Sequence, residues 1–237
     1  MMNTNLGNHI SQQFNNELED IRNRVLLMGG LVEQQLTDAI RSLLENDQEL
    51  AEKVIENDKE VNDYEVGIDE ECTTILARRQ PAASDLRLVI TVIKTIADLE
   101  RIGDESKRIA RMVLNIGDRS YDPKRVQMIR HLCEYSQAML HDVLDAFARM
   151  DTEASYKIYI NDRNVDKEYE GVTRQTITYM MEDPRSIPWV LNLMWVARAL
   201  ERIGDRATNI AEYIIFFVKG KDVRHTGPEG IEKTIKE

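Results

Sequence analysis

The chain has 237 residues and a formal net charge of −11, with 42% hydrophobic and only 6% aromatic residues. The acidic balance disfavours binding to nucleic acid, which needs a basic surface, and it also disfavours attraction to anionic lipid. The apolar content suffices for a substantial aliphatic core. The five Pro and eleven Gly leave room for long uninterrupted helices.

The chain carries no pattern of a secreted or membrane-embedded protein. Its first twenty residues are polar, unlike a signal peptide. The longest apolar run, Tyr213 to Val218, is far shorter than the ~18 residues that span a membrane. Cys72 and Cys133 lie within helical patterns without metal-ligand spacing, so we expect two buried thiols in a reducing compartment. These features together predict a cytoplasmic protein that is not embedded in the membrane.

Apolar residues spaced by three and four predict three long helices in the first half of the chain. The first ends at about Leu44, the second runs from about Glu49 to Arg79, and the third from about Asp85 to Asn115. Pro81 ends the second helix, because proline disfavours helical backbone in the residue before it. The segment from Gly117 to Pro123 breaks the third. The short polar turns between these helices predict antiparallel packing.

The first helix is the least regular of the three. Residues 1–8 resemble a frayed start, and Asn8 or Ser11 is a candidate N-cap. Within the helix, the pair Gly29-Gly30 weakens the helical preference by roughly 1 kcal/mol per glycine. We therefore expect either a kink or a close helix crossing at this pair.

The second half repeats this plan. Helices are predicted over about Lys124 to Arg149, Thr152 to Met181 and Trp189 to Lys219. Pro184 and Pro188 frame a loop that corresponds to the one at Pro81. The apolar seam of the last helix is the seam of the third helix moved by 101 positions. An internal repeat of this kind fixes the architecture.

The repeat is most exact in one acidic motif. Glu100-Arg101-Ile102-Gly103-Asp104 recurs unchanged as Glu201-Arg202-Ile203-Gly204-Asp205. In each copy the Glu and the Asp are four residues apart, so both carboxylates lie on one helix face and repel each other by a few tenths of a kcal/mol, roughly. A cation between them would turn this repulsion into a pair of ligands. The face lies at the flank of the core seam, where a cation has access.

The residues around the two copies differ. Lys107 and Arg111 follow the first copy, whereas Thr208 and Glu212 follow the second. The second copy therefore has more negative charge around it, and we expect it to hold a cation more tightly. Oxygen ligands select hard divalent or trivalent cations such as Mg²⁺, Mn²⁺, Ca²⁺ or ferric iron.

Two carboxylates are too few for a complete site, and the preceding helix of each half could supply further oxygen ligands. The candidates, which are also explained by an ordinary solvated face, are Asp58, Asn62 and Glu65 in the first half and Asp162, Asp166 and Glu170 in the second. For the motif carboxylates themselves, the alternative is a set of salt bridges to Arg101, Arg108 or Arg202. A di-iron oxidase is disfavoured, because it needs a His three residues after a ligating Glu, where this chain has Gly103 and Gly204.

The sequence predicts an all-α fold of two tandem, pseudo-symmetric three-helix bundles built from six long antiparallel helices. The expected repeats are residues 1–118 and 119–220, followed by a flexible charged tail at 221–237. A single fused six-helix bundle is the structural alternative.

On the two copies of Glu-Arg-Ile-Gly-Asp, the sequence resembles the PhoU family of bacterial phosphate-uptake regulators. The resemblance covers nearly the whole chain and includes Met28-Gly29-Gly30, Arg79-Gln80-Pro81-Ala82, Asp85-Leu86-Arg87 and the segment from Asp145 to Asp151. It implies a homodimeric, non-catalytic negative regulator of the phosphate-starvation response and of phosphate uptake. As implied partners it has the ATPase subunit of the phosphate ABC transporter and the sensor histidine kinase of the phosphate regulon.

The resemblance also assigns metal binding to the motif, on Glu100 and Asp104 and on Glu201 and Asp205. Separately, the helix end at Phe147, Ala148 and Arg149 combines an aromatic and a basic side chain, which is typical of a protein-docking anchor. Phe147 as an ordinary core residue is the alternative there. A metal-binding or metal-storing helical protein without an adaptor role is the alternative function.

Overall fold

A computed structural model describes the backbone of residues 4–120 and 122–237, and the side chains of residues 12–117 and 122–237. In these ranges the chain is almost entirely helical and contains no strand. The first half forms α1 (Thr4–Glu45), α2 (Gln48–Arg79) and α3 (Ala83–Ser120). The expected end of α2 is confirmed: Gln80 adopts the left-handed conformation (φ 48°) and the chain turns before Pro81.

The second half forms α5 (Arg130–Arg149), α6 (Thr152–Glu182) and α7 (Ile187–Lys219), preceded by the short α4 (Pro123–Val126) and a 3₁₀ turn at Gln127–Ile129. Asp47 and Asp151 cap α2 and α6 in the same way, with a carboxylate that accepts a hydrogen bond from a backbone N–H of the first turn. This equivalence supports the pseudo-symmetry predicted from the sequence.

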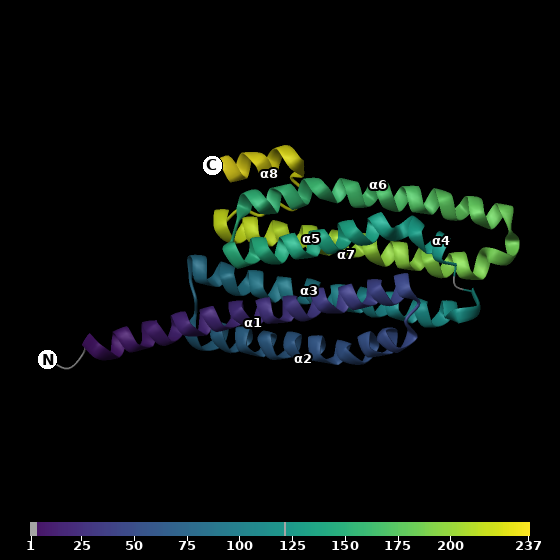
Figure 1. Ribbon diagram of the computed structural model, residues 1–237. Helices are drawn as coiled ribbons and strands as arrows, with labels where there is room; N and C mark the ends of the chain where they lie inside the picture. The colour runs from purple at the N-terminus through teal and green to yellow at the C-terminus, as the bar shows by residue number, and fades with distance from the viewer. Residues whose placement is uncertain (1–3, 121) are drawn as a thin grey trace.

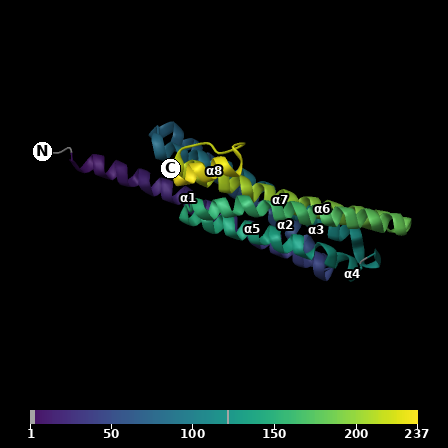
Figure 2. The same ribbon diagram turned by 90° about the horizontal axis from the view of Figure 1, so that it is seen from above.

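The long helices lie side by side and roughly parallel, with α2 at one edge, α6 towards the other, and α3 and α7 between them (Figure 1). The view from above shows the same elongated stack (Figure 2). The predicted all-helical bundle fold is confirmed. One core of buried aliphatic side chains nevertheless runs through all the long helices, from Ile21 of α1 to Ile214 of α7.

Gly29 explains how closely the halves pack. A Cβ atom at this position would lie 2.4 Å from Cδ2 of Leu144 on α5, so the Leu144 side chain occupies the space that glycine leaves and would have to move for any larger residue. Gly30 is exposed and has open space around it. Of the two expectations for this pair, the close crossing is therefore correct, and α1 continues through it as one helix.

Two expectations at the chain ends are wrong. The first helix already begins at Thr4, so neither Asn8 nor Ser11 is its N-cap; residues 1–3 lie outside the described part of the chain. The tail at 221–237 is not flexible but contains α8 (Gly227–Lys236), which packs on α6 and α7. Its apolar residues Ile231 and Ile235 bury themselves against Ile215, Tyr156 and Tyr159, a stripe that is short but regular enough to be helical.

Candidate metal sites

Both copies of the acidic motif lie on α3 and α7, which run antiparallel and pack against each other. Glycine sits at the centre of each copy and faces the preceding helix of its own half. A Cβ atom at Gly103 would lie 3.4 Å from Cγ1 of Val61 and 3.7 Å from Oδ1 of Asp58 on α2, and one at Gly204 would lie 3.2 Å from Cγ1 of Val165 and 3.3 Å from Oδ1 of Asp162 on α6. The missing side chain thus lets the carboxylate-bearing helices α2 and α6 approach α3 and α7.

The first site contains its own counter-ion. Asp58 of α2 is only 4% exposed, and Lys107 of α3 forms an ion pair with it and a second ion pair, at 2.8 Å, with Asp104. Gln35 donates a further hydrogen bond of 3.1 Å to Asp58 from α1. A buried carboxylate needs such partners, and here the chain supplies them.

Other carboxyl groups of the first site remain crowded. Burial raises the pKa of Glu100, and the charges of Asp104, Glu65 and Asp58 raise it further. The pKa of Glu65 is raised by burial and by Asp69, with Asp104 adding to the effect. The single ammonium of Lys107 therefore serves a cluster with a larger negative charge.

The second site has no lysine at the equivalent position, where Thr208 stands three residues after Asp205. Burial raises the pKa of Asp162 to about 6, and the charges of Asp205 and Asp166 contribute. The pKa of Asp205 is raised by burial and by Asp166, and that of Glu201 by burial and by Asp205. Burial is the largest cause of each of these shifts, and the nearby arginines Arg198, Arg202 and Arg206 offset the pKa increases of Glu201 and Asp205 only in part.

Arg198 is the nearest basic group, and it neutralises this site only in part. Its Nη1 atom lies 2.5 Å from Oε1 of Glu201. The other carboxylate oxygen of Glu201 is buried and finds no hydrogen-bond partner among the described residues. A buried oxygen without a donor costs free energy, and a hard cation would remove that cost.

The donor set of the second site therefore fits a hard cation, since it consists of carboxylate oxygens with excess negative charge. Asp162 and Asp166 of α6 are the predicted additional ligands that its electrostatics bring together with Glu201 and Asp205. In the side chains that the structure describes, no three Asp, Glu, His or Cys residues already converge as a finished metal site would. Binding would thus require the carboxylates to close around the ion.

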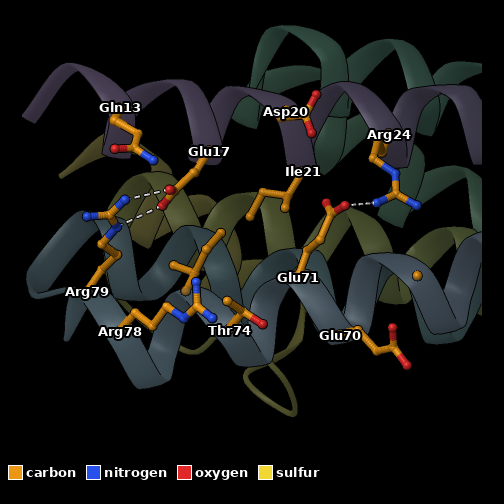
Figure 3. Close-up of a pocket in the computed structure, with 12 residues that line it drawn as sticks. Gln13, Glu17, Asp20, Ile21, Arg24, Glu70, Glu71, Thr74, Arg78 and Arg79 are labelled. Carbon is orange, nitrogen blue, oxygen red and sulfur yellow. Dashed lines mark hydrogen bonds and ion pairs between the residues drawn. The ribbon is translucent and has the colours of Figure 1, made fainter. Parts of the chain in front are cut away.

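A separate cleft of about 680 Å³ opens between the outer parts of α1 and α2, away from both motif copies. Its charged groups pair with each other: Arg79 binds Glu17 through two hydrogen bonds of 2.6 and 2.9 Å, and Arg24 binds Glu71 (Figure 3). Because these pairs already satisfy most of its charges, the cleft shows no site prepared for an ion.

Comparison with known proteins places this geometry in a family. The PhoU domain matches residues 25–113 and 129–214, which are the two helical repeats. This chain belongs to the PhoU family. It is 56% identical to the phosphate-specific transport system accessory protein PhoU of Serratia marcescens, over 99% of this chain and 96% of that one. With the protein of the same name from Escherichia coli K12 it shares 54% identity, over 98% and 95%.

Solved PhoU structures share the fold. The crystal structure of PhoU from Pseudomonas aeruginosa matches with a TM-score of 0.85 and 50% identity, over 88% of this chain and all of that one. The PhoU structure from Streptococcus pneumoniae matches with a TM-score of 0.82 at 30% identity, over 89% and 99%. As for membrane insertion, none of the described helices is both long and apolar enough to cross a bilayer.

The predicted docking segment, Phe147, Ala148 and Arg149, is only partly at the surface. Phe147 is fully buried in the core, so the idea that it anchors a partner directly is wrong, because its ring completes the packing of α5. The carbonyl of Ala148 accepts a hydrogen bond from Arg22 of α1. Arg149 is exposed and pairs with Asp145 at 2.5 Å. Of Phe147, Ala148 and Arg149, only Arg149 is therefore accessible to a partner through its side chain.

Sequence reasoning missed the polar bonds that tie α3 to α7. Buried Asp98 accepts hydrogen bonds from Arg206 at 3.2 Å and from the Tyr213 hydroxyl at 3.0 Å. Buried Glu105 accepts one from Arg202 at 3.0 Å. A buried charge is stable only when paired. The signal in the sequence for such a pair was an isolated Asp or Glu beside the apolar residues of a helix.

Glu170, predicted as a possible further ligand of the second site, is exposed and pairs with Arg174, away from the site.

Proposed function

We propose that this chain is a non-catalytic adaptor and negative regulator of the phosphate-starvation response and of phosphate uptake. It would act in the cytoplasm as a homodimer, between the ATPase subunit of the phosphate ABC transporter and the sensor histidine kinase. The observation that carries the proposal is the identity of 51–56% with accessory proteins of phosphate-specific transport systems over nearly the whole chain.

The site supports binding better than catalysis. Its carboxylates have raised pKa values, as oxygen ligands of a cation would in its absence, and the family relatives are named accessory proteins. An adaptor works by contacting one state of its partner better than another. A helical bundle with a single core presents the rigid surface that such selection requires.

We further propose that a hard cation, Mg²⁺, Mn²⁺, Ca²⁺ or iron, binds at Glu201 and Asp205 with help from Asp162 and Asp166. The first site, with Glu100, Asp104 and Asp58, would bind more weakly because Lys107 already neutralises part of it. The cation would supply positive charge and hold α6 against α7. The buried, unpaired oxygen of Glu201 is the main support for this assignment.

A pull-down from phosphate-replete cells tests the adaptor role. The native chain is expected to recover both the transporter ATPase and the sensor kinase. The double variant Glu201→Gln with Asp205→Asn keeps side-chain shape and removes two charges. Its control is Glu56→Gln with Glu60→Gln, an exposed acidic pair with the same spacing on α2.

Recovery of neither partner by the native chain, under conditions that preserve weak complexes, would overturn the adaptor role. Loss of both partners in the motif variant alone would place the cation at the interface. Retention in both variants would leave the adaptor role intact and make the cation structural. Cation stoichiometry, measured on the same preparations, separates an adaptor with few ions per chain from a storage protein with many.

A further inference from the structure

An apolar stripe lies exposed on the first half of α7. Ile187, Leu191 and Trp195 are 38%, 45% and 54% exposed. Their spacing of four residues places them on one helix face. Large apolar side chains scattered singly are normal at a surface, but three in a row with a tryptophan indicate an interaction site.

Helix α6 extends this stripe. Arg198 of α7 stacks over the ring of Tyr169 on α6, with 5.8 Å from the guanidinium carbon to the ring centroid. Because the two helices run antiparallel, Ile177, eight residues after Tyr169, comes level with Leu191, seven before Arg198. Ile177 is itself 46% exposed. Ile177 lies about three helical turns after Asp166, so the two residues are on the same face of α6. This is the face of α6 that is turned towards the exposed stripe on α7.

Two arginines continue the face of Trp195 along α7. Arg198 and Arg202 lie three and seven residues after Trp195, and both side chains are about two-fifths exposed. Each guanidinium has five N–H donors, and each ion pair shown for these residues involves only Nη1. On a chain with a net charge of −11, an exposed tryptophan beside two arginines is a distinct surface, and tryptophan and arginine are the residues enriched at binding hot spots.

The first half shows what covers such a face. Ile90 and Lys94 of α3 are the counterparts of Leu191 and Trp195, 101 positions earlier, and both are half-buried. The end of α7 lies over Lys94, whose ammonium is 5.2 Å from the ring centroid of Tyr213 and 5.7 Å from that of Phe216.

On α3 the counterparts of these two aromatic residues are Met112 and Asn115. Neither offers an aromatic ring to the face around Trp195, which stays more than half exposed. The end of α7 thus covers this face of the first half at Lys94, although Leu86, the counterpart of Ile187, is 37% exposed. The two halves differ at Trp195, which has no such aromatic cover in the described part of the chain.

We propose that Ile187, Leu191 and Trp195, with Arg198 and Arg202, form a docking surface for an amphipathic helix of another protein. The partner helix packs apolar side chains on Leu191 and Trp195, as helices do in grooves. Its acidic flank meets Arg198 and Arg202, because opposite charges steer and orient docking. The apolar contacts of this surface involve none of the motif carboxylates, whereas Arg198 also pairs with Glu201 of the second acidic site.

Site-specific photo-crosslinking of the full chain in cells tests it. A benzophenone side chain is placed at position 191, and a matched probe at position 27, where Leu27 is a similarly exposed but isolated apolar residue on α1. We expect a crosslink at 191 that is absent at 27. Mass spectrometry should place it in a helical segment with apolar residues on one face and Asp or Glu beside them.

The crosslinked segment is then synthesised and titrated into the purified chain. Trp195 reports binding by a shift of its fluorescence to shorter wavelength, with the buried Trp189 replaced by Phe to leave one signal. Leu191→Asp should weaken binding at least tenfold and Leu27→Asp should not change it. A crosslink to a second copy of this chain, to lipid or to a segment without acidic residues would overturn the proposal, as would equal crosslinking at 191 and 27.

Discussion

The two acidic sites carry the same five residues and yet differ in where their positive charge comes from. In the first, Lys107 reaches across to buried Asp58 and also holds Asp104. In the second, Thr208 stands at the equivalent position, the pKa of Asp162 is raised to about 6, and an oxygen of Glu201 is unpaired among the described residues. The two sites thus differ at one position outside the motif, where the first has an ammonium between two carboxylates and the second has a threonine hydroxyl.

Replacing Lys107, the positively charged residue of the first site, should have the largest effect on this difference between the two sites. Lys107→Thr should lower the free energy of unfolding by about 3 kcal/mol, because it leaves buried Asp58 without its charged partner. Urea denaturation measures the loss, and millimolar Mg²⁺ or Mn²⁺ should restore part of it. Lys59→Thr, on the exposed side of α2, is the control and should change stability by less than about 0.5 kcal/mol. An equal effect of both variants would contradict the role given to Lys107.

The converse exchange supplies the missing charge to the second site. Thr208→Lys should lower the affinity for a divalent cation by about tenfold or more, because an ammonium close to the carboxylates competes with the ion. Isothermal titration calorimetry on the native chain and the variant measures this. Thr208→Val removes the hydroxyl without adding charge and serves as the control. Unchanged affinity in the lysine variant would show that the cation binds elsewhere.

The raised pKa of Asp162 predicts a pH dependence that the cation should reduce. An unfolded Asp titrates near pH ~3.9, whereas the folded value is about 6. Between these values the folded state binds more protons, so the free energy of unfolding falls as pH rises. We expect a fall of about 1–2 kcal/mol, reduced by access to water. Thermal unfolding at pH 4.5, 5.5 and 6.5 measures it. It should become smaller with Asp162→Asn and with saturating cation, and the part that remains comes from the other carboxyl groups with raised pKa values, such as Glu201 and Asp205. An unchanged fall in Asp162→Asn would contradict the assignment to Asp162.

The glycines at the motif centres give the smallest expected effect and sharpen the comparison. Alanine at Gly204 gains about 1 kcal/mol of helix preference but places its Cβ atom 3.2 Å from Val165 and 3.3 Å from the Asp162 carboxylate. The net change in stability should stay within about 1 kcal/mol while cation affinity falls. Gly30→Ala, in open space, should simply stabilise the chain. Unchanged cation affinity in Gly204→Ala would remove Asp162 from the site.

Much of the fold could be predicted from the sequence because its signals are local. Apolar spacing and the prolines determined the long helices, and the repeat determined their pseudo-symmetry. The C-terminal helix was missed because its stripe contains only Ile231 and Ile235 within a charged segment. Its stability comes from packing on Tyr156 and Tyr159, which no local pattern reveals.

The acidic site could be predicted in its residues but not in its charge balance. Spacing alone placed Glu201 with Asp205 on one face, and the difference between Lys107 and Thr208 was visible in the sequence. The pairing of Lys107 with Asp58, 49 positions away, depends on the packing of α2 against α3. The same holds for burial: nothing in the sequence distinguished a core Phe147 from an exposed one.

The crossing at Gly29, where Leu144 of the other half occupies the space of a side chain, has a consequence for the independence of the two halves. Two copies of one segment are still readable in the sequence, but one hydrophobic core now runs through both of them. A fragment ending at residue 118 would expose the surfaces of α1 and α3 that α5 and α7 now cover. We therefore expect neither half to be stable alone, and two halves that depend on one shared core can differ in chemistry without either having to fold by itself.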